Sequence, residues 1–151
     1  MASRSVVQHR RVVLVDDNAD VRRLLRNQLE LGGYAVVGEA SDGDEAIRVV
    51  ERLRPHLVVL DLEMRRMSGV TALPAIRAAA PKCCIVVFSA FPDPFTLAAV
   101  LSLGADLYVD KAQGPGRLLE HLRALLAEAP PASDDTDDER LNYIYMRSLA
   151  I

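Results

Sequence analysis

The stretch that most constrains the fold is the apolar run Leu57–Leu60, which leads directly into Asp61. A short, unbroken run of branched apolar residues is typical of a strand that is buried on both faces of a parallel sheet. In open parallel sheets, ligands bind at the carboxyl ends of the strands. Asp61 is therefore predicted to lie where such a fold carries its chemistry.

Other predicted strands also end close to polar side chains. Because the carboxyl ends of parallel strands meet at one edge of the sheet, these side chains are expected to converge with Asp61. They are Asp16 and Asp17 after Val12–Val15, Ser89 after Cys84–Phe88, and Lys111 after Leu107–Val109.

Segments with helical spacing follow the predicted strands. In the first of them, apolar residues recur at intervals of three and four, from Val21 through Leu24 and Leu25 to Leu29. A later one follows a predicted loop, Gly114-Pro115-Gly116. Five strands that alternate with five helices predict an α/β fold with a doubly wound, five-stranded parallel sheet. The predicted strands are residues 11–15, 34–39, 57–60, 84–88 and 107–109.

The chain divides into four predicted parts. Residues 1–10 are expected to be a flexible N-terminal arm, 11–128 the folded domain, 129–139 an acidic linker and 140–151 an apolar tail. In the tail, Leu141, Ile144 and Tyr145 fall on one helical stripe. The tail is either a frayed end or a helix that docks on this domain, on a second copy or on a partner.

Composition narrows the classes of partner and location. The 151 residues carry a net charge of −3, which gives no support to direct nucleic-acid binding. No segment resembles a signal peptide, and the apolar runs fall short of the roughly 20 residues that a membrane helix needs. We expect a cytoplasmic protein that does not bind membranes.

The polar set suggests phosphoryl chemistry. Asp16, Asp17 and Asp61 would repel one another without a cation, and several carboxylates with no histidine suit Mg²⁺ better than zinc. With Mg²⁺ bound, one carboxylate can attack a phosphoryl group as a nucleophile. Lys111 and the Ser89 hydroxyl would then contact the phosphoryl oxygens.

The combined motifs resemble a known family. The sequence has DD after the first strand, D-x-x-M-x-x-M-x-G after the third, S-A after the fourth and Y-x-x-K around the fifth. From Arg11 to about Ala127, this order resembles the receiver domain of two-component response regulators. The resemblance implies a flavodoxin-like (βα)5 fold, a three-layer sandwich. It also implies a signalling module that is not an enzyme in the usual sense. Because the segment after Ala129 is too short for a DNA-binding domain, we expect a stand-alone receiver.

The resemblance further implies a role for each matching residue. Asp61 would be phosphorylated by a sensor histidine kinase or a phosphotransfer protein, and the module would act on a downstream effector or form a homodimer through the face of helix four, strand five and helix five. The implied roles are Mg²⁺ binding for Asp16, Asp17, Asp61 and the Glu63 backbone carbonyl, phosphoryl contact for Lys111, and switching for Ser89 and Tyr108.

Two other functions stay open. Arg65 stands where the family commonly has proline, and Pro92 and Pro94 stiffen the loop that should move. These features leave open a pseudo-receiver that serves as an interaction scaffold. A haloacid-dehalogenase-like phosphatase that uses Asp16 as its nucleophile is the other alternative.

Overall fold

A computed structural model of the chain describes residues 10–90 and 93–128. The predicted linker at 129–139, the predicted tail at 140–151 and all of the predicted arm except Arg10 lie outside the described residues. None of the helices in the described ranges has the length and apolar character needed to cross a bilayer.

The centre of the fold is a sheet of five strands in the order β2-β1-β3-β4-β5, and every neighbouring pair is parallel. The predicted doubly wound parallel sheet is therefore confirmed. The strands are β1 Arg11–Val15, β2 Ala35–Ala40, β3 Leu57–Leu60, β4 Cys84–Ser89 and β5 Leu107–Asp110.

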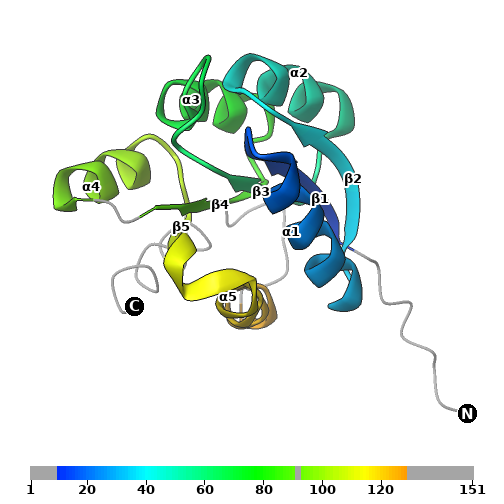
Figure 1. Cartoon of the computed structure of the whole chain (residues 1–151). Coiled ribbons are helices and arrows are strands. Elements are labelled where there is room, and N and C mark those ends of the chain that lie inside the picture. Colours follow the sequence, from blue (N-terminus) through cyan, green and yellow to red (C-terminus); the bar gives the residue numbers. More distant parts are fainter. Residues whose placement is uncertain (1–9, 91–92, 129–151) are drawn as a thin grey trace, which may run out of the picture.

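Helices cover both faces of the sheet, which gives three layers (Figure 1). One face is covered by α1 and α5, and the other by α2, α3 and α4. The α-helices are α1 Ala19–Leu31, α2 Gly43–Leu53, α3 Gly69–Ala79, α4 Pro94–Ser102 and α5 Gly114–Glu128, and a 3₁₀ helix, η1, spans Lys111–Gln113.

The position of β3 at the centre of the sheet explains why its sequence is apolar without alternation. Val58 and Leu60 belong to the core beneath α2 and α3, whereas Leu57 and Val59 belong to the core beneath α1 and α5. All four side chains are buried because both faces of the sheet are covered. Asp61 is thus anchored by a strand that the core holds on two sides.

Local capping fixes where the helices next to the site begin. Asn18 accepts hydrogen bonds from the backbone N–H groups of Asp20 and Val21, so α1 starts at Ala19, two residues after Asp17. At the start of α4, the Asp93 side chain accepts from the Thr96 N–H. Each cap ends a loop that leaves the carboxyl edge of the sheet, which keeps these loops short.

The sequence prediction was wrong about Gly114-Pro115-Gly116. These residues form the first turn of α5 rather than a loop. Gly114 has a φ of 82°, which is a conformation that glycine adopts at little cost, and so the chain turns there from η1 into α5. Pro115 then fits the first turn, where a missing N–H removes no helical hydrogen bond.

A second difference concerns the inner face of α1. Leu25 and Leu29 are buried as expected, but the Leu24 side chain is 48% exposed. Leu24 and Leu25 are adjacent on the helix and lie about 100° apart around its axis, so the sheet can fully cover only one of them.

Candidate functional site

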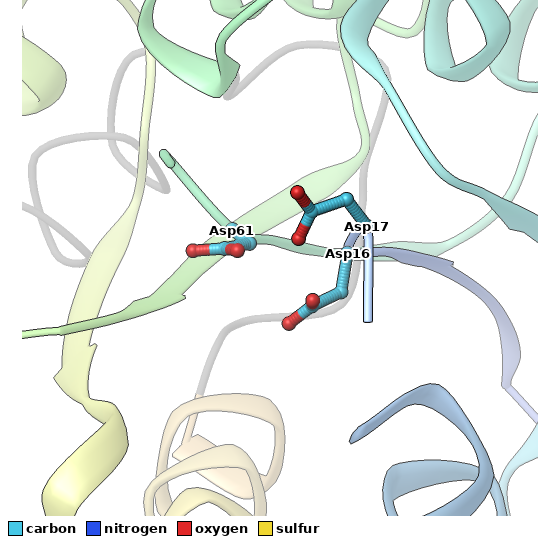
Figure 2. A group of neighbouring side chains, drawn as sticks. All are labelled: Asp16, Asp17 and Asp61. Carbon is cyan, nitrogen blue, oxygen red and sulfur yellow. The ribbon is translucent and has the colours of Figure 1, made fainter. Parts of the chain in front are cut away.

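Three carboxylates gather at the carboxyl edge of the sheet. Asp16 and Asp17 follow β1 and Asp61 follows β3, and these strands pair with Val15 opposite Leu60. The register therefore puts Asp16 beside Asp61. One carboxylate oxygen from each of the three lies within 4.8 Å of the others (Figure 2).

Lys111, which directly follows the edge strand β5, also contacts this cluster. Its Nζ lies 2.6 Å from Asp16 Oδ2 and 3.4 Å from Asp61 Oδ2, so one ammonium group bridges two carboxylates. Burial by itself lowers the pKa of Lys111. The hydrogen bond to Asp16 and the charges of Asp61 and Asp16 outweigh that effect, and the net result is a raised pKa. Lys111 therefore carries its charge at neutral pH.

Ser89, the last residue of β4, is in direct contact with Asp61. Its buried hydroxyl donates to Asp61 Oδ1 at 2.8 Å and accepts from the Leu62 N–H at 3.3 Å. The hydroxyl thus links the ends of β3 and β4. A change in the charge of Asp61 would therefore alter the hydrogen bond of Ser89 and the position of the loop that follows Ser89.

Asp61 is only 5% exposed, and its environment disfavours ionisation. Burial is the largest cause of its raised pKa, and the charge of Asp16 adds to it. Ser89, Lys111 and the Glu63 N–H act in the opposite direction but do not cancel the effect. An added cation beside Asp61 would therefore favour its ionised form.

Glu63 and Tyr108 flank this centre. The Glu63 backbone N–H lies 3.4 Å from Asp61 Oδ1, whereas the predicted role of the Glu63 carbonyl stays a prediction. The Tyr108 hydroxyl donates to the backbone carbonyl of Ala90, the residue after Ser89. Burial raises the pKa of Tyr108 to about 12, so the phenol stays protonated and can serve as a donor.

A cleft of about 640 Å³ opens beside Ser89 and Asp17. Its walls come from the segment after β3, from the segment after β4 and from α4, so a small molecule could approach the carboxylates through it. Arg65, which the sequence marks as unusual, lies in this wall and is exposed. The other lining residues are Asp17, Leu62, Glu63, Met64, Ser68, Val70, Ser89, Ala90, Asp93, Thr96 and Tyr108.

Sequence reasoning missed Arg22 as part of the site. Its Nη1 donates to the Asp16 backbone carbonyl at 2.6 Å, and its Nε pairs with Glu39 Oε1 at 3.1 Å. Arg26 binds the second oxygen of Glu39 at 2.7 Å. Burial would raise the pKa of Glu39, but the two arginines outweigh it and the net pKa is lowered. No motif marks these residues, because their contacts depend on how α1 lies against β2.

Gly69 is a second residue whose role only the structure explains. A β-carbon at this position would lie 2.1 Å from the Asp61 backbone carbonyl oxygen. The Gly69 N–H also donates to the Leu62 carbonyl, so the start of α3 is held against the end of β3. The glycine that closes the D-x-x-M-x-x-M-x-G motif is the sequence signal for this close approach.

The donor set fits a hard divalent cation. The carboxylate oxygens converge within coordination reach, and no histidine or cysteine belongs to the cluster. Two of the three carboxylates are buried, and Lys111 contributes only one positive charge to them. Such an arrangement favours a bound cation such as Mg²⁺ over a softer metal.

Comparison with known proteins identifies the family. Residues 12–123 match the family model described as the response regulator receiver domain. The chain is 34% identical over 113 residues to the chemotaxis protein CheY of Thermotoga maritima, which covers 75% of this chain and 94% of that protein. It is 31% identical over 146 residues to the alkaline phosphatase synthesis transcriptional regulatory protein PhoP of Bacillus subtilis. That match covers 95% of this chain and 60% of PhoP.

Some relatives are much longer than this chain. It spans 54% of a transcriptional regulator of Porphyridium aerugineum and 30% of a protein-glutamate methylesterase/protein-glutamine glutaminase of Hahella chejuensis.

Solved structures show the same fold. A two-component response regulator of the LuxR family from Aurantimonas is 30% identical with a TM-score of 0.74, and the match covers 95% of this chain and 99% of that one. The isolated REC domain of RcsB from Salmonella enterica is 28% identical with a TM-score of 0.72, covering 88% and 98%. On these matches and on its fold, the chain belongs to the response regulator receiver domain family.

Proposed function

We propose that this receiver is a phosphoaspartate switch in which Asp61 accepts a phosphoryl group from a sensor histidine kinase or a phosphotransfer protein. The observation that carries the proposal is that Asp61 lies at the centre of the site. Lys111 and Ser89 both contact it, and the two remaining carboxylates stand within 4.8 Å.

The transfer would proceed by attack of an Asp61 carboxylate oxygen on phosphorus. The oxygen–phosphorus bond forms as the phosphorus–nitrogen bond of the donor's phosphohistidine breaks, and the leaving imidazole takes up a proton from solvent. Lys111 would exchange its contacts with the carboxylates for contacts with the phosphoryl oxygens. The Ser89 hydroxyl would donate to a phosphoryl oxygen instead of to Asp61.

The expected cofactor is Mg²⁺, held by Asp16, Asp17 and Asp61 together with the Glu63 backbone carbonyl. When bound, this ion would supply positive charge that stabilises the phosphoryl oxygens. Asp16 and Asp61 are buried and close to each other, so they gain from a cation whether or not a phosphoryl group is present. Arg22 would support this set through the Asp16 carbonyl.

The output would be a change in surface. A phosphoryl group that draws Ser89 inward also pulls Ala90, and the Tyr108 hydroxyl is bonded to the Ala90 carbonyl. Tyr108 would then change rotamer and alter the face formed by α4, β5 and α5. A downstream effector or a second copy of the chain would read that face. Cytoplasmic localisation and the absence of direct nucleic-acid binding stay predictions.

The contacts of Asp16 weigh against the phosphatase alternative. Asp16 Oδ1 accepts from the Asn18 N–H, and Asp16 Oδ2 accepts from Lys111 at 2.6 Å. Of the two buried carboxylates, Asp61 is the one that receives the Ser89 hydroxyl as well as a contact from Lys111, which makes it the better-placed phosphoacceptor. The scaffold alternative would tolerate the loss of any of the five polar positions, yet all five are present and lie together at one edge of the sheet.

Beryllofluoride, a mimic of the phosphoryl group, tests the proposal directly. With Mg²⁺ present, we expect it to raise the melting temperature of the wild-type protein and to bind with one-to-one stoichiometry by calorimetry. Asp61→Asn should abolish both effects, because beryllofluoride needs the carboxylate oxygen as its ligand.

A matched control is Asp20→Asn, which removes an exposed carboxylate in the first turn of α1. This variant should respond like the wild type. If the wild-type protein does not respond, or if Asp61→Asn responds equally, the phosphoacceptor proposal fails and the scaffold alternative gains.

A further inference from the structure

The cleft beside Asp61 carries a charge that opposes the substrate of the proposed reaction. Phosphodonors are anions, yet the described residues that line the cleft include the carboxylates of Asp17, Glu63 and Asp93. Glu63 and Asp93 are both exposed. An anionic donor that enters the cleft is therefore repelled by these groups unless a cation offsets them.

Arg65 is the only cationic side chain among the described residues that line this cleft. It is exposed, and it makes no hydrogen bond or ion pair with any residue in the ranges 10–90 and 93–128. Its guanidinium group is therefore free to bind a ligand. The planar set of N–H donors in this group matches the oxygens of a phosphoryl group.

The start of α3 adds to the same wall of the cleft. Ser68 and Val70 line the cleft together with Arg65. The Ser68 hydroxyl, a neutral cap, accepts from the Thr71 N–H at 3.2 Å, and the first turn of α3 has no acidic residue. The positive end of the α3 dipole is thus not offset from within the helix, whereas α4 is capped by the Asp93 carboxylate. The wall that includes Arg65 is therefore the one that attracts an anion.

We propose that Arg65 determines which phosphodonors reach Asp61, by binding the phosphoryl group of a small dianionic donor such as an acyl phosphate. This inference rests on the proposed phosphoacceptor role of Asp61. The cleft volume of about 640 Å³ suits a small molecule. Ser89, which donates to Asp61, lines the same cleft as Arg65, so a donor bound there adjoins the reacting carboxylate.

The role of Arg65 is to bind the donor rather than to break a bond. As an Asp61 oxygen bonds to phosphorus, the bond from phosphorus to the acyl oxygen breaks. The carboxylate of the donor leaves with the electron pair, and no proton is needed. Arg65 offsets the repulsion between the dianion and the carboxylates of the cleft, so its loss weakens donor binding.

Arg66 provides a matched control at the next position in the chain. It is not among the residues that line the cleft. Its Nη1 lies 3.8 Å from Asp42 Oδ2, and its side chain is 85% exposed. Arg65→Gln and Arg66→Gln change the net charge equally, and both positions are exposed, so both variants should fold. A difference between them reports where the charge lies.

A titration with acetonylphosphonate tests binding without any transfer, because this acetyl phosphate analogue cannot give up its phosphonate. The amide signals of residues 62–70 in NMR spectra, recorded with Mg²⁺ present, report the dissociation constant. We expect this constant to rise about fivefold in Arg65→Gln. It should be unchanged in Arg66→Gln and should stay within about twofold of the wild type in Arg65→Lys, which keeps the charge.

Three results of this titration would overturn the role of Arg65. They are the same constant in the wild type and Arg65→Gln, an equal loss of affinity in Arg65→Gln and Arg66→Gln, and no binding to the wild type.

The rate of Asp61 labelling tests the selection of donors. With acetyl phosphate, the second-order rate constant should fall about fivefold in Arg65→Gln, and the difference should shrink as the salt concentration rises. Phosphoramidate carries less negative charge at neutral pH, so its rate constant should fall less. Equal losses for the two donors would contradict selection by charge. No labelling in any of the proteins would refute the phosphoacceptor role of Asp61, whereas the titration would still decide whether Arg65 binds the donor.

Discussion

Individual contacts hold the backbone of the acidic site in place before any ligand arrives. Arg22 joins the Asp16 carbonyl to Glu39 on β2, and Gly69 lets α3 begin against the Asp61 carbonyl. Neither residue offers an atom to a phosphoryl group. Both act by fixing the strand ends from which the carboxylates project.

Replacing Arg22 with methionine should destabilise the protein by about 1–2 kcal/mol. The change removes a charged hydrogen bond to a backbone carbonyl and leaves Glu39 with only Arg26 as a partner. Urea denaturation measures the effect. Arg23→Met, at an exposed neighbouring position, should stay within about 0.5 kcal/mol of the wild type. Equal losses in the two variants would contradict the anchoring role.

Gly69→Ala should cost about 3 kcal/mol or more, because the new methyl group would meet the Asp61 backbone oxygen at 2.1 Å. The control is Gly116→Ala in α5, where an added β-carbon meets no heavy atom within 4 Å. That change should stabilise the protein by up to about 1 kcal/mol, since alanine favours a helix. Thermal or urea unfolding of both variants would show opposite signs, and a mild effect at Gly69 would rule out the close approach.

The polar residues at the strand ends could be predicted because parallel strands share one carboxyl edge. Asp16, Asp17 and Asp61 needed only that rule. Arg22 could not be found in this way, because its contact depends on how a helix lies over a neighbouring strand.

At the scale of elements, the opposite edge of the sheet carries a pH-sensitive contact. His56 lies just before β3. Its side-chain Nδ1 accepts a hydrogen bond from the Arg11 backbone N–H at 2.9 Å, and its backbone N–H donates to the Arg11 carbonyl. Burial, followed by the charges of Arg11 and Arg10, lowers the pKa of His56. The neutral imidazole is the form that joins β1 to β3.

This contact should make stability fall on mild acidification. Since the folded pKa of His56 lies below the ordinary value of about 6.5, its contribution is complete above that pH and is lost as the pH falls toward the folded pKa. The urea midpoint of the wild type should therefore drop between about pH 7.5 and about pH 5.5.

His56→Gln should flatten this slope without removing it. His121, whose pKa is lowered by burial and by Arg117, would contribute to the remaining slope. Parallel pH profiles for His56→Gln and the wild type would mean that the Nδ1 contact carries no pH dependence.

The order and type of the elements followed from the sequence, but some details did not. The run at β3 and the spacing in α1 reflect burial on a sheet with two covered faces, which a single sequence records well. The start of α5 was missed because glycine and proline mark both loops and first helical turns. Only the backbone at Gly114, with its positive φ, distinguishes the two.

At the scale of the whole molecule, the site exists because five strands with one direction end at one edge. Contributions from β1, β3, β4 and the segment after β5 meet there, although Asp16 and Lys111 are 95 positions apart in the chain. The family match over residues 12–123 coincides with the part of the chain that builds this edge. Each strand end follows from local sequence, and only the assembled sheet brings these ends together.

The most direct test of the central claim is mass spectrometry after incubation with Mg²⁺ and a small acyl phosphate donor. We predict a gain of one phosphoryl group per chain, sensitive to hydroxylamine as an acyl phosphate should be, and mapped to Asp61. The gain should be absent in Asp61→Asn and dependent on added Mg²⁺. A label on Asp16, or no label in the wild-type protein at saturating donor, would contradict the account.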